Sequence, residues 1–295
     1  MLGEHPYQVT PVRFAGVPQG CLTPDGPEYS VRRVYVERLP VPALAGDLRT
    51  LWIQRVGDEP YVQRHLPTGG VELHFPIGGR PRLLGPLTRA RLEVLPAHLT
   101  LVGLRFHPGA APPLPMPLDE LVDQHVDLAA DRLAEAVAMA GSPERALETI
   151  QALLPVRAVD PLVTEAVRLL MPWHPVGIDS LAGHLALSPS QLRRRCLQAV
   201  GVSPKALQRT LRFQGFLALA QAGAGSIAGL AADAGYADQA HLSRECLRLT
   251  GLTPRALLGG SVEACACGHD HSASYLPFLR DSFKNRRNGV PSLAR

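Results

Sequence analysis

Hydrophobic and polar residues alternate at every second position through much of the N-terminal third of the chain. The alternation is clearest in four segments, which are YSVRRVYVERL (29–39), LRTLWIQRV (48–56), VELHFPI (71–77) and RLEVLPAHLTLVGLRF (91–106). Because neighbouring side chains of a strand point to opposite faces, this pattern predicts half-buried β-strands. Short turn sequences rich in proline and glycine separate the segments, which indicates an antiparallel β-sandwich or a barrel-like sheet.

The spacing of apolar residues changes after the proline-rich segment GAAPPLPMP (109–117). LDELVDQHVDLAADRLAEAVAMAG (118–141) and SPERALETIQALLP (142–155) carry apolar residues at helical spacing, and Ser142 stands where a helix N-cap is expected, with a proline after it. From Asp160 to about residue 260 the pattern is helical throughout. The sequence therefore predicts an α+β protein in which a β-rich domain precedes an all-helical domain.

The helical half contains an internal repeat, in which SLAGHLALSPSQLRRRCLQAVGVSPKAL (180–207) aligns with GLAADAGYADQAHLSRECLRLTGLTPRAL (229–257). Each copy predicts a short helix, a tight turn and a second helix of about twelve residues, which is the helix-turn-helix arrangement. The segment 204–223 predicts the helix that joins the two copies.

The second helix of each copy has an inward apolar face and an outward polar face. The inward positions are Leu192, Cys196 and Val200 in the first copy and Leu242, Cys246 and Leu249 in the second. The outward or flanking positions are Ser190, Gln191, Arg193, Arg194 and Gln198 in the first copy and Gln239, Ala240, His241, Arg244 and Arg248 in the second. Arginine can pair with guanine and glutamine with adenine in the major groove, so these faces predict binding to double-stranded DNA. We expect Arg212 and Arg255 to contact phosphates.

The distribution of charge agrees with this prediction. The chain has a formal net charge of +4, whereas the segment 176–260 holds nine Arg or Lys against four Asp or Glu, a local balance of +5. The helical half thus carries the whole positive excess, as a nucleic-acid-binding domain joined to a near-neutral domain would. The repeat, the capping residues and this charge together favour DNA binding over a helical interaction module with merely solvated arginines.

These residues also carry a family resemblance. SIAGLAADAGYADQAHLSRECLRLTGLTPRAL (226–257) closely resembles the second helix-turn-helix of AraC/XylS-type transcription regulators, and residues 180–213 resemble the first. The resemblance implies base contacts by Ser190, Arg193, Arg194, Gln239, Ala240, His241 and Arg244. The chain departs from the family at Cys196 and Cys246, where Phe is usual, and at Ala237, which replaces a serine N-cap and leaves Asp238 as the expected cap.

The N-terminal half resembles the β-rich, cupin-like sensory domain of some of these regulators. The resemblance rests on HLPTGGVELHF (65–75), GPLTR (85–89) and VGLRFHPGAAPPL (102–114). It implies a one-component bacterial regulator, typically an activator, whose partners are a small-molecule effector, a DNA operator, RNA polymerase and a second copy in a homodimer. The expected division is 1–117 for the sensory domain, 118–157 for a helical linker or dimerisation segment, 158–260 for the double helix-turn-helix domain and 261–295 for a tail.

Nothing in the sequence favours catalysis. It contains no glycine-rich phosphate loop, nucleophile elbow or paired-carboxylate motif. His65, His74, His98 and His107 are isolated along the chain, and we expect each to be a structural histidine and not a metal ligand. We therefore expect no catalytic residues, and a cupin enzyme with an appended helical module is the weakest alternative.

The tail holds the one cluster of soft metal ligands along the sequence. In CACGHDH, the side chains of Cys265, Cys267, His269 and His271 alternate within seven residues. A regulator that senses Zn or Cu through this cluster is the alternative function. We favour an unmetallated polar extension and hence no cofactor, because side chains at every second position of a short loop seldom reach four tetrahedral corners.

The sequence predicts a cytoplasmic protein without membrane contact. No apolar stretch reaches the roughly eighteen residues of a membrane span, and the N-terminus lacks the pattern of a signal peptide. The five cysteines are too few to form a disulfide scaffold, so we expect reduced thiols.

Overall fold

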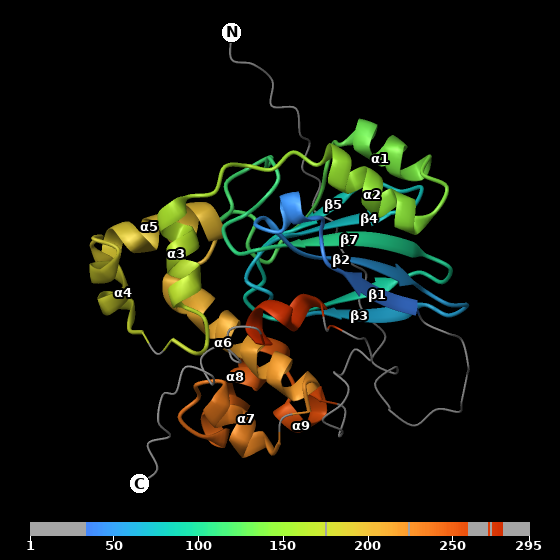
Figure 1. Ribbon diagram of the computed structural model, residues 1–295. Helices are drawn as coiled ribbons and strands as arrows, with labels where there is room; N and C mark the ends of the chain where they lie inside the picture. Colours follow the sequence, from blue (N-terminus) through green and yellow to red (C-terminus); the bar gives the residue numbers. More distant parts are fainter. Residues whose placement is uncertain (1–33, 175, 224, 259–270, 272, 280–295) are drawn as a thin grey trace.

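A β-sheet domain is followed by a helical domain in the computed structural model (Figure 1), which describes residues 34–174, 176–223, 225–258, 271 and 273–279. The predicted α+β class is confirmed. The sheet is open and does not close into a barrel.

All strand pairs in the described residues are antiparallel, and they form two sheets. The larger sheet has the strand order β1-β2-β7-β4-β5-β8, and β3 pairs with β6 in the smaller one. The strands are β1 (Val34–Arg38), β2 (Leu48–Arg55), β3 (Tyr61–His65), β4 (Glu72–Pro76), β5 (Arg82–Leu84), β6 (Arg91–Leu95), β7 (Thr100–Phe106) and β8 (His125–Asp127).

The prediction of a helix over residues 118–141 is wrong for the first half of that segment. Strand β8 lies within it, and α1 (Asp131–Ala138) begins only at Asp131. Tertiary contacts override the helical spacing here. Asp123 has a left-handed φ of 57°, and its carboxylate accepts hydrogen bonds from the Thr88 backbone N and hydroxyl at 2.8 and 2.6 Å. The chain then adds β8 to the edge of β5.

The larger sheet buries an apolar face against two helices. Helices α1 and α2 (Pro143–Leu153) cover this face (Figure 1). Helix α2 begins at the predicted N-cap, where the Ser142 hydroxyl accepts from Arg145 N at 3.2 Å. The core includes Leu51, Ile53, Leu73, Phe75, Val102 and Leu104 from the strands and Leu147 and Ile150 from α2. The two helices are thus packed as part of the sheet domain.

The opposite face of the larger sheet is polar and also buried. Glu72 and His74 alternate along β4 with the apolar residues of the core, and they are 5% and 0% exposed. The smaller sheet covers this face: Gln54 on β2 donates to Gln63 on β3 at 3.0 Å, and Arg82 on β5 donates to Glu93 on β6 at 2.7 Å. The space between the two sheets is therefore lined largely by hydrogen-bonding groups.

The helical domain packs around the long helix α6. Its helices are α3 (Pro161–Leu169), α4 (Ile178–His184), α5 (Pro189–Val200), α6 (Pro204–Gln221), α7 (Ile227–Asp233), α8 (Gln239–Thr250) and α9 (Pro254–Leu257). The two predicted helix-turn-helix units are α4–α5 and α7–α8, and α6 joins them, as the repeat predicted. No helix in the described ranges is long and apolar enough to cross a membrane.

The two domains are joined by backbone and side-chain hydrogen bonds. Gln214 on α6 donates to the Pro67 carbonyl at 2.7 Å, Ala90 N donates to the Leu249 carbonyl at 2.6 Å, and Arg64 donates to the Thr250 carbonyl at 2.9 Å. The helical residues 273–279, red in Figure 1, lie between the sheet and α6.

Gly103 on β7 allows the buried indole of Trp52 to lie across the polar face. A Cβ atom at Gly103 would lie 2.2 Å from the nearest indole carbon. We expect Gly103→Ala to lower the free energy of unfolding by about 1–3 kcal/mol through overpacking. Gly183→Ala is the matched control, because nothing lies within 4 Å of the added Cβ in α4. Urea unfolding measures both variants, and equal stability of the two would contradict this packing role.

Candidate nucleic-acid interface

Helix α5 begins at a complete capping box. The Ser188 hydroxyl accepts from Gln191 N at 3.2 Å, and the Gln191 side chain accepts from Ser188 N at 2.8 Å. Pro189 occupies the first helical position, and the helix ends at Gly201 in the left-handed conformation with a φ of 83°. These local signals fix both ends of the helix and leave its first turn exposed, as the sequence predicted.

Helix α8 is capped by Asp238, as expected from the replacement of the usual serine by Ala237. The Asp238 carboxylate accepts from His241 N at 2.6 Å. The His241 ring turns back toward the preceding loop, where its Nδ1 accepts from Ala237 N at 3.4 Å. Its centroid lies 5.2 Å from that of the Tyr236 ring, in an edge-to-face arrangement. His241 is therefore half-buried in this conformation.

The predicted inward faces of both helices are buried. Leu192, Cys196, Val200, Leu242, Cys246 and Leu249 are each at most 2% exposed. Burial raises the pKa of Cys196 to about 11 and that of Cys246 to about 12, so both thiols stay protonated at neutral pH. The two cysteines thus act as packing groups and not as nucleophiles.

The predicted outward residues lie at the surface. Ser190, Gln191, Arg193, Arg194, Gln239, Ala240, Arg244 and Arg248 are exposed. Within the described part of the chain, Arg193, Arg194 and Arg244 form no ion pair, whereas Arg248 Nη1 lies 4.0 Å from Glu245 Oε1. Exposed, unpaired guanidinium groups near a capped helix start can bind phosphates and base edges without first breaking an internal contact.

Other arginines of the helical domain have structural contacts. Arg195 pairs with Asp160 at 2.6 Å, and Arg209 on α6 lies 3.1 Å from Glu245 on α8. The guanidinium of Arg212 lies 5.6 Å from the centroid of the Tyr236 ring and is half-buried. Arg212 is thereby held beside the turn that leads into α8, and its contact with phosphate stays a prediction.

A cavity of about 530 Å³ lies between the two domains. It is lined by Gly46, Asp47, Arg49, His107, Pro108, Ala110, Val159, Thr164, Val167, Arg168, Met171, Leu211, Pro277 and Phe278. The sheet domain, α3, α6 and the segment 273–279 each contribute to its walls. A ligand in this cavity would contact both domains at once.

Arg49 on β2 is the buried cation of this cavity, and the sequence pattern gave no sign of it. Its side chain is 4% exposed, Nη1 donates to the Thr68 carbonyl at 3.3 Å, and Nε has no hydrogen-bond partner among the described residues. Burial and the neighbouring Arg105 lower its pKa to about 10, so Arg49 remains charged at neutral pH. A buried cation with an unused donor favours an anionic ligand.

His65 and His74 are isolated along the chain, but the structure brings them together. Their ring centroids lie 5.4 Å apart, and His65 Nε2 is 2.9 Å from Glu93 Oε2. The ring centroid of His125 lies 5.8 Å from that of His74. His125 and Glu93 were missed because they lie on strands distant in the sequence. His98 is exposed, and burial lowers the pKa of His107 to about 4.

The predicted metal ligands Cys265, Cys267 and His269 of the tail lie outside the described residues. His271 is described, and its Nδ1 lies 2.9 Å from Glu37 Oε1 on β1. Metal binding by the tail thus stays a prediction.

Two family matches cover different parts of the chain. Residues 181–259 match the family HTH_18, described as a helix-turn-helix domain, and residues 36–127 match DUF6597, described as a domain of unknown function. No curated protein matches the sequence.

Among solved structures, the chain is similar to ToxT from Vibrio cholerae. The crystal structure from strain O395 shares 11% identity over 69% of this chain and 94% of ToxT, with a TM-score of 0.41. A 1.65 Å structure of ToxT shares 10% identity over 75% of this chain and 97% of ToxT, with a TM-score of 0.43. A third structure, wild-type ToxT bound to an unsaturated fatty acid, shares 13% identity over 68% of this chain and 87% of ToxT, with a TM-score of 0.38.

The matched domain and the two capped, exposed helices define a DNA-binding protein. Residues 181–259 form a helix-turn-helix domain of the HTH_18 family, which is attached to a β-sheet domain, and the chain resembles regulators of the AraC family.

Arg194 and Arg244 test the assignment of α5 and α8 to base recognition. We expect Arg194→Ala and Arg244→Ala each to weaken operator binding by about 1–3 kcal/mol and to relax specificity at one base position. Arg80→Ala is the matched control, because it removes an exposed arginine from the sheet domain. Fluorescence anisotropy at matched salt measures specific and random duplexes, and unchanged binding of both would show that α5 and α8 do not read bases.

Arg212 tests the other role, which is phosphate contact. Arg212→Ala is expected to weaken binding to all DNA sequences alike. It should also lower the magnitude of the slope of log binding constant against log salt concentration by about one. Arg212→Lys keeps the charge and controls for loss of packing on Tyr236. A loss of affinity confined to one operator position would assign Arg212 to base readout instead.

Proposed function

We propose that this protein is a one-component transcription regulator whose DNA affinity is controlled by a small molecule in the cavity between the sheet and the helical domain. The observation that carries the proposal is the placement of this cavity. Its walls combine Arg49 from β2 with Val167 from α3, Met171 just after α3 and Leu211 from α6, which joins the two helix-turn-helix units. A ligand held by both domains can change how they pack, and hence how α5 and α8 are presented.

The chemistry of the walls favours an anionic ligand with an apolar body. Apolar side chains form much of the lining, whereas Arg49 supplies a charged donor without a carboxylate partner. The volume of about 530 Å³ is in the range of small-molecule sites. A carboxylate of modest chain length satisfies both conditions, because its head can pair with Arg49 while its chain covers Val167 and Met171.

Octanoate and the neutral 1-octanol form a matched pair of probes. We expect octanoate to raise the melting temperature of the full chain more than octanol does, since only the anion pairs with Arg49. Arg49→Gln should remove this difference, and Val167→Trp should block both ligands by filling the cavity. Arg80→Gln and Leu153→Trp are controls at exposed positions. Equal effects of the two probes, or octanoate binding by Val167→Trp, would contradict the proposed pocket.

An effector must also change DNA binding. The operator can be found by genomic footprinting with the full chain, and its affinity is then measured with and without octanoate. A melting-temperature shift without any change in operator affinity would mean that the cavity binds ligands but does not regulate. Activation through RNA polymerase, which the AraC/XylS resemblance supports, is tested by in vitro transcription from the same operator.

A second copy of the chain is the proposed partner of the smaller sheet. Val62, Leu92 and Val94 lie on its outer face and are 36%, 37% and 46% exposed, and Val62 pairs directly with Val94. We expect light scattering to show a homodimer that Val62→Glu/Val94→Glu converts to monomer, because two charges cannot be buried unpaired. The exposed control is Met139→Glu. A dimer that survives the double substitution would place the interface elsewhere.

A further inference from the structure

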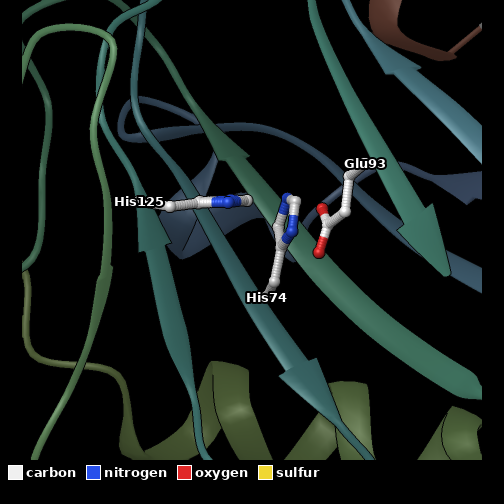
Figure 2. Close-up of side chains that lie close together, drawn as sticks. All are labelled: His74, Glu93 and His125. Atoms are coloured by element: carbon white, nitrogen blue, oxygen red, sulfur yellow. The ribbon is translucent and has the colours of Figure 1, made fainter. Parts of the chain in front are cut away.

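Three buried side chains from three strands converge in the space between the two sheets. His74 lies on β4, Glu93 on β6 and His125 on β8, and one potential ligand atom from each lies within 4.8 Å of the others. Figure 2 shows the His74 ring between the His125 ring and the Glu93 carboxylate. All three side chains are at most 4% exposed. The arrangement therefore does not arise from a solvated surface cluster.

The nitrogen atoms of this cluster are short of hydrogen-bond partners. Nδ1 of His74 and both ring nitrogens of His125 have no partner among the described residues. Buried polar atoms are normally satisfied by protein, water or a bound ion. Three unpartnered nitrogens in two adjacent rings, next to a carboxylate, match the donor set of a metal site better than that of a packed core.

The neighbours of the cluster orient its ligand atoms. Glu72 Oε2 lies 3.4 Å from His74 Nε2, so a proton on Nε2 leaves Nδ1, which has no partner among the described residues, with a free lone pair. Arg82 donates to Glu93 Oε1 at 2.7 Å, which leaves Oε2 on the side of His65, at 2.9 Å from its Nε2. Such carboxylate–histidine contacts are the usual supports of metal ligands.

The protonation states also suit metal binding. Burial lowers the pKa of His74, and burial together with the nearby His74 lowers that of His125 to about 2, so both rings are neutral at neutral pH. Burial alone would raise the pKa of Glu93. Hydrogen bonding to His65 and the charge of Arg82 outweigh this effect and hold the pKa well below its usual range. Neutral imidazoles and an ionised carboxylate are the forms that bind metal.

We propose that His74, His125 and Glu93 bind a divalent transition-metal ion, tested here as Zn²⁺, between the two sheets of the sensory domain. Two imidazoles and one carboxylate favour an ion that is intermediate between hard and soft, such as Zn²⁺, over Mg²⁺ or Ca²⁺, which prefer oxygen ligands. Ligand atoms around tetrahedral zinc lie about 3.3 Å apart, a separation that the three ligand atoms, within 4.8 Å of one another, reach by a small inward movement. Glu72 and His65 are positioning residues for His74 and Glu93.

The test uses the full chain carrying Cys265→Ser and Cys267→Ser, so that tail thiolates do not contribute. The protein is stripped with a chelator and titrated with Co²⁺ as a spectroscopic probe and then with Zn²⁺. We expect one ion per chain, visible d–d absorption without the near-ultraviolet thiolate-to-metal band, and a higher melting temperature with Zn²⁺. His184→Gln removes an exposed imidazole and serves as the matched control.

Three variants separate ligands from positioning residues. His74→Gln and His125→Gln should abolish the Co²⁺ spectrum, whereas Glu72→Gln should weaken binding about 10–100-fold and leave the spectrum in place. Circular dichroism checks that each variant is folded. If folded parent protein binds no Co²⁺ at micromolar concentrations, or if His125→Gln binds as well as His184→Gln, the proposal is overturned and water must satisfy the ring nitrogens.

Discussion

The buried guanidinium of Arg105 organises the polar face of the larger sheet. Arg105 on β7 donates to Glu37 on β1, to Glu72 on β4 at 3.0 Å and to the Ser274 hydroxyl at 2.7 Å. Removing one partner from such a network would leave an uncompensated buried charge, which typically costs about 3–5 kcal/mol. Burial alone would raise the pKa of Glu37. The contacts with Arg105 and His271 outweigh this effect and hold the pKa well below its usual range, so the carboxylate that pairs with Arg105 is ionised.

This charge network also joins the two domains. The Glu37 carboxylate accepts from Ser274 N at 2.8 Å, and the helical segment 273–279 inserts Tyr275 and Phe278 into the core of the helical domain. On the other side, the strand β3 leads directly into Pro67, whose carbonyl accepts from Gln214 on α6. Helix α8 is held by hydrogen bonds that Ala90 N and the Arg64 side chain of the sheet domain donate to its Leu249 and Thr250 carbonyls. The presentation of α8 thus depends on the sheet domain.

The helix-turn-helix units could be predicted from sequence because their signals are local. The capping box of Ser188 and Gln191, the cap at Asp238 and the apolar spacing of each helix lie within one or two turns of the element they specify. The cluster of His74, Glu93 and His125 could not be predicted in this way, since it depends on strand pairing and on how two sheets face one another. Alternation along β4 separated the face of Glu72 and His74 from that of Leu73 and Phe75, but it did not show that the polar face is buried.

The two proposed ligand sites differ in what binding could change. The cavity has walls from both domains, so a ligand there can favour one packing of the domains over another by direct contact with each. The metal site lies wholly within the sheet domain, so an ion there stabilises that domain first. It can reach the DNA-binding helices only through strands it holds in place. One such route is short, because His65, which contacts Glu93, ends the strand that leads to Pro67 and its hydrogen bond from Gln214. A second contact of the same strand is the hydrogen bond from Arg64 to the Thr250 carbonyl on α8. Because an ion shifts the arrangement of the domains only as far as its affinity differs between arrangements, any coupling of metal to DNA binding through β3 depends on whether these two hydrogen bonds change with the arrangement.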